Sequence, residues 1–184
     1  MVLPNVNAPR IGIIISTVRS SRVGPKVAEW IAQGAPRGID VDIIDLAQVN
    51  LPFFTDAVMP AMDSYDQDTT KAWGKQVAGY DGFIIALGEY NGGYPAPLKN
   101  AIDTVYKEWN GKPVGVVSYG SHGGGRARTA LKPVLQTVRA VEIDGPTLRF
   151  NEQIALDGQI IAAPQDDLGK MYTELVESLP DKPF

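Results

Sequence analysis

A cluster of hydroxyl and guanidinium groups lies between residues 16 and 22, where the sequence reads STVRSSR. Hydroxyls and arginines bind phosphate oxygens through hydrogen bonds, which the arginine charge strengthens. The cluster follows an apolar run of strand length, Ile11 to Ile15, and precedes a helical pattern that has Pro25 near its start. A helix N-terminus adds free N–H groups and a positive dipole end. The stretch therefore predicts a phosphate site, although an N-capping serine beside solvated arginines explains the same residues.

A glycine-rich loop with two tyrosines follows another apolar run, Phe83 to Leu87. From residue 88 to 95 the sequence reads GEYNGGYP. Glycines let the backbone approach a ligand closely, and tyrosine rings offer flat apolar faces. In open α/β sheets, ligands bind in loops of this kind, at the carboxyl ends of strands. An ordinary turn between a strand and a helix explains the same glycines.

A third loop, residues 120–126 with the sequence GSHGGGR, follows an apolar run that begins at Pro113. It holds His122, the only histidine of the chain. A lone histidine in a loop is usually a surface residue, and the backbone N–H groups of this loop are the stronger candidates for a ligand contact. The patterns GxxxxGK[ST] and GxGxxG are both missing, so neither a Walker loop nor a dinucleotide fingerprint is predicted.

Alternating strand and helix patterns place these loops in one α/β domain, residues 1–184. The pattern predicts a doubly wound, flavodoxin-like sheet of five parallel strands in the order 2-1-3-4-5, with helices on both faces. In that order strands 1, 3 and 4 are neighbours at the switch point, so the three loops converge on one ligand. A phosphate cradle beside flat ring faces indicates flavin mononucleotide, FMN.

Two further patterns lie outside the loops. A helix is expected to carry Leu98 through Trp109, and a last helix has a stripe of apolar residues from Leu168 to Leu179 that includes Val176. Residues 47–68 show no periodicity but hold Phe53, Phe54, Met59 and Met62. So much apolar surface in a loop predicts packing on a partner subunit, over a ligand or on its own domain.

Composition excludes several classes of function. The 184 residues carry a net charge of −4, with 44% hydrophobic and 21% charged residues, so neither nucleic acid nor a membrane surface is an expected partner. The absence of cysteine and the single histidine argue against a metal site. A chain without cysteine fits the cytoplasm, and the N-terminal sequence MVLPNVNAPR lacks the features of a signal peptide.

Three motifs in the same order resemble those of the NADPH-dependent FMN reductases, the flavodoxin-like quinone, azo and chromate reductases. The family's G-S-T-R-x-x-R-x-G is matched by residues 16–24, STVRSSRVG, with Ser16 in place of glycine, Thr17 in place of serine and Val18 in place of threonine. Its P-E-Y-N-x-S/G-Y-P is matched by residues 88–95, with Gly88 in place of proline. Its S-Y-G-x-x-G-G-x-R-A is matched by residues 118–127, and the resemblance extends from about Arg10 to Val138.

The resemblance implies which residues bind FMN. The phosphate would lie on Thr17, Arg19 and the backbone near residues 21–24, and the isoalloxazine ring against residues 89–92. The loop at residues 119–124 would donate backbone N–H groups to the pyrimidine end of the ring. In full, the implied FMN-binding residues are Thr17, Arg19, Ser21, Arg22, Val23, Gly24, Glu89, Tyr90, Asn91, Gly92, Ser118, Tyr119, Gly120, Ser121, His122, Gly123 and Gly124.

The implied activity is that of an oxidoreductase in which NADPH or NADH passes hydride to FMN. Electrons then reach a small-molecule acceptor: a quinone, an azo compound, a metal oxyanion or free flavin. No side chain is expected to be catalytic, and no metal is implied. The apolar loop around Phe53, Phe54 and Met59 and the helix after Pro95 are the expected contacts of a homodimer or a tetramer, and the resemblance implies that the flavin lies near that interface. Two alternatives share the fold: a flavodoxin-type electron carrier without a nicotinamide site, and an FMN-binding sensor module.

Overall fold

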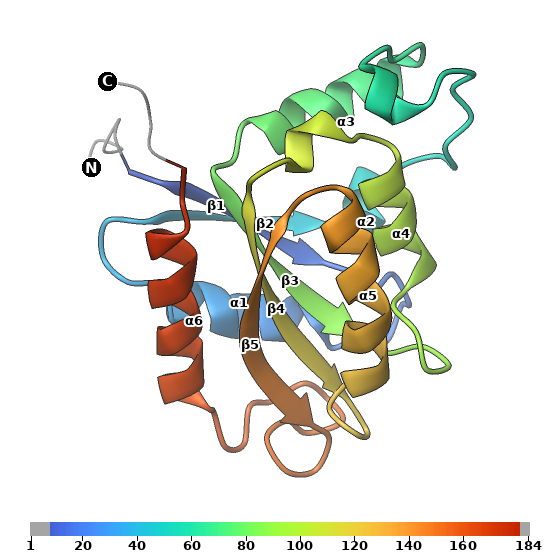
Figure 1. Cartoon of the computed structure of the whole chain (residues 1–184). Coiled ribbons are helices and arrows are strands. Elements are labelled where there is room, and N and C mark those ends of the chain that lie inside the picture. Colours follow the sequence, from blue (N-terminus) through green and yellow to red (C-terminus); the bar gives the residue numbers. More distant parts are fainter. Residues whose placement is uncertain (1–7, 181–184) are drawn as a thin grey trace.

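Five parallel strands form one sheet in a computed structural model that describes residues 8–180 (Figure 1). The strand order is β2-β1-β3-β4-β5, as the sequence predicts. The N-terminal stretch in which a signal peptide was sought lies largely outside the described residues. The strands are β1 (Arg10–Ile15), β2 (Asp40–Asp45), β3 (Gly82–Gly88), β4 (Pro113–Gly120) and β5 (Val141–Arg149).

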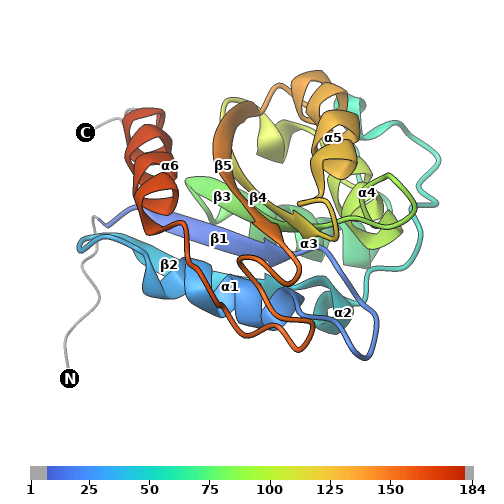
Figure 2. The ribbon, with the colours of Figure 1, turned by 90° about the horizontal axis from the view of Figure 1, so that it is seen from below.

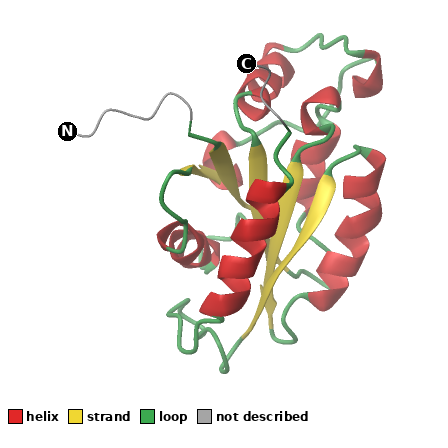
Figure 3. Cartoon of the chain, turned by 60° about the vertical axis from the view of Figure 1, so that its left-hand side comes forward, coloured by secondary structure: helices red, strands yellow, loops and turns green. Residues whose placement is uncertain are grey.

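Helices cover both faces of the sheet (Figures 1 and 3). One face packs against α1 (Gly24–Gln33) and α6 (Gln165–Glu177). The other face packs against α3 (Asp68–Ala78), α4 (Ala96–Asp103) and α5 (Gly125–Thr137). The short elements are α2 (Leu46–Val49) and the 3-10 turns η1 (Pro60–Met62) and η2 (Lys107–Trp109).

The inner strands are buried along almost their whole length, which explains why their sequences lack polar alternation. Every residue of β3 and β4 is buried, and so is β1 apart from Arg10. In register, Ile13 pairs with Ile43 on one side and with Ile84 on the other. Because the strands are parallel, their carboxyl ends lie at one edge of the sheet, and the loops after β1, β3 and β4 gather there (Figure 1).

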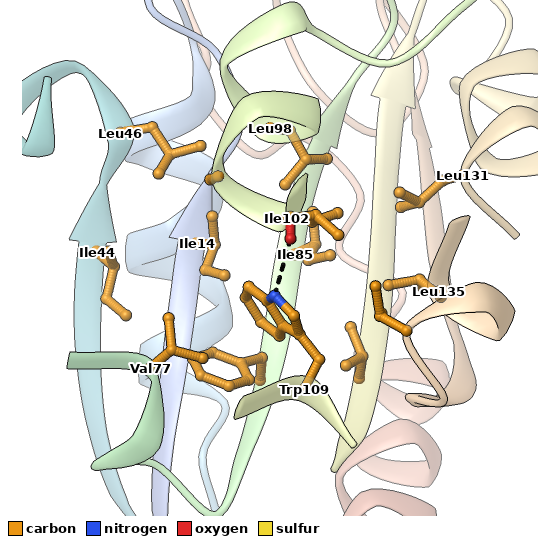
Figure 4. Close-up of a cluster of buried hydrophobic side chains, with 14 of the residues drawn as sticks. Ile14, Ile44, Leu46, Val77, Ile85, Leu98, Ile102, Trp109, Leu131 and Leu135 are labelled. Carbon is orange, nitrogen blue, oxygen red and sulfur yellow. Dashed lines mark hydrogen bonds between the residues drawn. The ribbon is translucent and has the colours of Figure 1, made fainter. Parts of the chain in front are cut away.

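Trp109 packs in the core beneath α4 (Figure 4). Its indole N–H donates to the carbonyl of Ile102 at 3.2 Å, and its ring lies 5.0 Å from that of Phe83. The expectation that Trp109 continues the preceding helix is wrong, because α4 ends at Asp103. Thr104 is the C-cap residue, and its hydroxyl donates to the Asn100 carbonyl at 2.6 Å.

Two other helices carry informative residues. Helix α5 begins at Gly125 and contains Pro133 in its interior. In α6 the stripe Leu168, Met171, Tyr172 and Leu175 is buried, whereas Val176 is exposed. None of the helices in residues 8–180 is long and apolar enough to cross a membrane.

One side chain, Asn100, anchors the start of the aperiodic segment between β2 and α3. Asn100 of α4 accepts from the Phe54 N–H at 3.1 Å and donates to the Pro52 carbonyl at 2.9 Å. Phe54 is half-buried as a result, but Phe53 and Met59 remain 79% and 67% exposed. Packing within this chain therefore accounts for only part of the segment's apolar surface.

Candidate active site

A cleft of about 380 Å³ opens at the carboxyl ends of β1, β3 and β4. It brings together residues from the loop after β1 (residues 16–22), from the loop after β3 (residues 88–95, here called the tyrosine loop) and from the end of β4. The strand order requires this convergence. The segment that follows β5 closes one side. The lining residues are Thr17, Arg19, Ser21, Arg22, Val23, Gly88, Glu89, Tyr90, Tyr119, Gly120, Phe150 and Leu156.

The remaining sequence-predicted residues lie close to the cleft without lining it. Gly24 is the first residue of α1, and Ser118 is buried inside β4, with its hydroxyl 3.4 Å from that of Thr147. Asn91, Gly92, Ser121, His122, Gly123 and Gly124 belong to the turns after β3 and β4.

The two arginines of the first loop differ in environment. Arg22 is largely buried and donates to the carboxylate of Asp45 at the end of β2. The Arg22 Nε atom is also buried, and it has no hydrogen-bond partner among residues 8–180. Arg19 is exposed at the cleft and makes no ion pair with any described residue. Most of the positive charge free to meet an anion therefore lies on Arg19.

A hydroxyl pair forms part of the cleft wall. The hydroxyls of Thr17 and Tyr119 lie 3.1 Å apart, which links the end of β1 to the end of β4. Thr17 is 2% exposed and Tyr119 is 4% exposed. Burial raises the pKa of Tyr119 to about 12, so its phenol stays protonated near neutral pH and can serve as a hydrogen-bond donor.

Ser16 joins β1 to the tyrosine loop. Its hydroxyl donates to the Ala86 carbonyl at 2.8 Å and accepts from the Gly88 N–H at 3.1 Å. A proline at residue 88 would have no N–H to donate. A Cβ atom there would also lie 2.5 Å from Cγ2 of Thr17. Ser16 and Gly88, both departures from the family motifs, therefore form one hydrogen-bonded unit.

Glu89 connects the tyrosine loop to α5. Its Oε2 atom accepts from the backbone N–H groups of Arg126 and Ala127, at 3.1 and 3.3 Å. These N–H groups lie in the first turn of α5, where a carboxylate also meets the positive end of the helix dipole. Sequence reasoning gave Glu89 no partner, because the two segments are 37 residues apart.

The tyrosine loop is a tight turn. The backbone groups of Tyr90 and Gly93 exchange hydrogen bonds of 2.9 and 3.0 Å. Asn91 lies at the tip with a φ of 51°, and Gly92 follows it. The closed turn keeps Tyr90 at the cleft.

The glycine loop after β4 offers fewer free donors than the sequence suggested. Tyr119 and Gly120 belong to β4, between β3 and β5, and the Gly123 N–H donates to the Gly120 carbonyl at 3.1 Å. The N–H groups of Ser121, His122 and Gly124 have no acceptor among the described residues. The prediction of backbone donors from this loop therefore rests on those three residues.

Sequence reasoning missed Gly88, Phe150 and Leu156 as lining residues. Gly88 was noted only as a departure from a motif. Phe150 and Leu156 follow β5 and belong to none of the three motifs, so no motif indicated a ligand contact there.

The cleft fits FMN. Arg19 and the hydroxyl of Ser21 lie beside the N-terminus of α1, a donor set suited to a dianionic phosphate. The Arg22 Nε–H, buried without an acceptor among the described residues, adds a further donor. The aromatic residues Tyr90, Tyr119 and Phe150 supply apolar surface in the same cleft.

The model of the family described as NADPH-dependent FMN reductase matches residues 9–155. This chain belongs to that family. It is an oxidoreductase of the NAD(P)H-dependent FMN reductase type, with FMN as its cofactor, and the expected flavodoxin-like fold is confirmed.

Relatives of known name agree. A Schizosaccharomyces pombe protein named NAD(P)H-dependent FMN reductase is 46% identical over 95% of this chain and 94% of its own length. A Saccharomyces cerevisiae protein of the same name is 35% identical over 77% of this chain and 81% of its own length. The solved structure of FerB, a flavoenzyme NAD(P)H:acceptor oxidoreductase from Paracoccus denitrificans, superposes with a TM-score of 0.73. The superposition covers 94% of this chain and 100% of the FerB chain, at 20% sequence identity. Because the identity is so low, this likeness supports the fold alone.

The Ser16 bridge yields a testable prediction. Ser16→Ala leaves the Gly88 N–H buried without its acceptor, so we expect the free energy of unfolding to fall by about 1–3 kcal/mol. Urea denaturation measures the loss. Ser20→Ala, in the exposed part of the same loop, is the matched control and should change stability by less than about 0.5 kcal/mol. Equal stability of the two variants would show that the bridge contributes nothing.

Proposed function

We propose that this protein is an NAD(P)H-dependent FMN reductase that acts on a quinone, azo compound, metal oxyanion or free flavin, and that the cleft described above is its flavin site. The observation that carries the proposal is the joint lining of one cleft by Arg19, Ser21 and Tyr90. These residues come from different loops of the sheet edge and match the phosphate and ring motifs. We further propose that residues 1–184 are a single FMN-binding domain.

The roles of the chain's residues follow from their positions. Arg19 binds the phosphate as an exposed cation. The backbone N–H groups of Val23 and Gly24, at the N-terminus of α1, supply further donors. Asp45 holds Arg22 in place and offsets much of its charge. The hydroxyl pair of Thr17 and Tyr119 fixes the wall between β1 and β4. A cradle assembled in advance in this way does not have to be ordered when the ligand binds.

The ring-binding role falls to Glu89 through Gly92 and to the turn after β4. The carboxylate of Glu89, bound to the N-terminus of α5, fixes where the tyrosine loop begins. The N–H groups of Ser121, His122 and Gly124 are the donors that can meet negative charge on a bound ring. FMN itself supplies the hydride and electron transfer between nicotinamide and acceptor.

One experiment distinguishes the reductase activity of this chain from the two alternatives raised by the fold, an electron carrier without a nicotinamide site and a sensor. Anaerobic mixing of the FMN-loaded protein with NADPH separates them. A reductase loses its flavin absorbance near 450 nm rapidly, at a rate that depends on the NADPH concentration, and recovers it when a quinone is added. Bound flavin that stays oxidised with both NADPH and NADH would refute the proposed activity while leaving FMN binding intact.

No side chain of the cleft is proposed as a catalytic acid or base. Glu89 is engaged by backbone N–H groups, and His122 is exposed in a turn. We therefore expect His122→Ala and Glu89→Gln to lower kcat by far less than the ~10²–10⁴-fold loss typical of a general acid or base. Gln keeps an oxygen that can accept from α5. Steady-state kinetics at saturating FMN test this, and a thousandfold fall in kcat with flavin still bound would contradict it.

The protein is proposed to form a two-fold dimer or a tetramer of such dimers. Phe53, Met59 and Met62 are 79%, 67% and 66% exposed, and Phe53 lines an apolar groove of about 340 Å³ beside α2 and α4. A partner subunit would bury this surface. Light scattering should give two or four times the chain mass of 19.8 kDa, and a stable monomer at micromolar concentration would contradict the proposal. The lack of cysteine supports a cytoplasmic location.

A further inference from the structure

The segment between β5 and α6 forms a wall of the cleft that the sequence motifs do not predict. It leaves the end of β5 beside β4 and runs toward α1 before α6 begins (Figure 2). Two of its residues, Phe150 and Leu156, line the same cleft as Arg19 and Tyr90. The family model ends at residue 155, so Leu156 lies just beyond the match.

Backbone hydrogen bonds fix both ends of this wall. The Phe150 N–H donates to the Gly120 carbonyl at 3.1 Å, which joins the wall to the glycine loop after β4. Farther along, the Gly158 N–H donates to the Ala155 carbonyl at 2.9 Å and closes a turn with Leu156 at its tip. Ile154, between them, is fully buried in the core that α1 and α6 share.

The turn packs directly against the start of α1, the helix that follows the loop at residues 16–22. Gly158 has a φ of 89°, and a Cβ atom there would lie 2.9 Å from Cδ of Lys26 and 3.1 Å from Cβ of Val23. Glycine is therefore required for the turn to pack against α1. This packing holds Leu156 at the cleft, near the residues expected to bind phosphate.

Leu156 is 70% exposed although the turn that carries it is well fixed. A large apolar side chain held at the mouth of a cleft gains free energy when a ligand covers it. An apolar side chain gains nothing from a phosphate, so its contact is with the part of the ligand that FMN shares with riboflavin.

We infer that Leu156 is a further flavin-contacting residue, and that the wall from Phe150 to Gly158 slows release of FMN so that FMN stays bound between turnovers. This rests on the proposed flavin site.

The test compares Leu156→Ala with Ile161→Ala. Ile161 belongs to the same segment and is 57% exposed, but it does not line the cleft. Both side chains are exposed, so thermal unfolding should be unchanged in each variant. Flavin fluorescence gives the dissociation constants for FMN and riboflavin, and dilution into excess apoflavodoxin gives the FMN release rate.

We expect Leu156→Ala to raise both dissociation constants roughly tenfold, the effect of losing three carbons that a ligand half-buries. FMN release should accelerate by a similar factor, while Ile161→Ala and the volume-conserving Leu156→Met should stay within about twofold of the wild type. Wild-type affinities in Leu156→Ala, or an equal loss in Ile161→Ala, would overturn the inference and leave the flavin site standing. Failure of the wild type to bind FMN would overturn both.

Discussion

The site depends on hydroxyl bridges that join the carboxyl ends of three neighbouring strands. Ser16 bonds the end of β1 to backbone groups of β3, and the Thr17 hydroxyl meets that of Tyr119 in β4. A parallel sheet brings strand ends to one edge but does not fix the loops that follow. Buried side-chain hydrogen bonds supply this constraint here, and their burial makes each one costly to lose.

The two arginines of the first loop have different roles, because Arg22 is paired with a carboxylate and Arg19 is exposed. Asp45 pairs with Arg22 and also accepts from the Ala47 N–H at 3.0 Å, so one carboxylate positions the loop and begins α2. Arg19 keeps its charge exposed at the cleft. A net charge of −4 repels anions on average, so binding of a phosphate requires a local cation of this kind.

Much of the fold could be predicted because burial on both faces leaves a clear pattern. The runs from Ile11 to Ile15 and from Phe83 to Leu87 lack polar residues for this reason, and both are strands. Contacts between distant loops leave no such pattern. The bonds of Glu89 to α5 and of Arg22 to Asp45 depend on the tertiary packing of segments that are distant in the sequence. The wall that carries Leu156 belongs to none of the three sequence motifs. Trp109 misled because its spacing matched a continuation of α4, whereas α4 ends at Asp103 and Trp109 lies in the separate 3-10 turn η2.

The proposed flavin site depends above all on Arg19, which binds the phosphate of FMN in this cleft, and flavin affinity measures that contact. Fluorescence titration of the wild type and Arg19→Ala should be made with both FMN and riboflavin. We expect the wild type to prefer FMN, and Arg19→Ala to lose about 1.5–3 kcal/mol of FMN affinity with riboflavin binding unchanged. Equal affinity of the wild type for the two flavins, or an equal loss for both in Arg19→Ala, would contradict it.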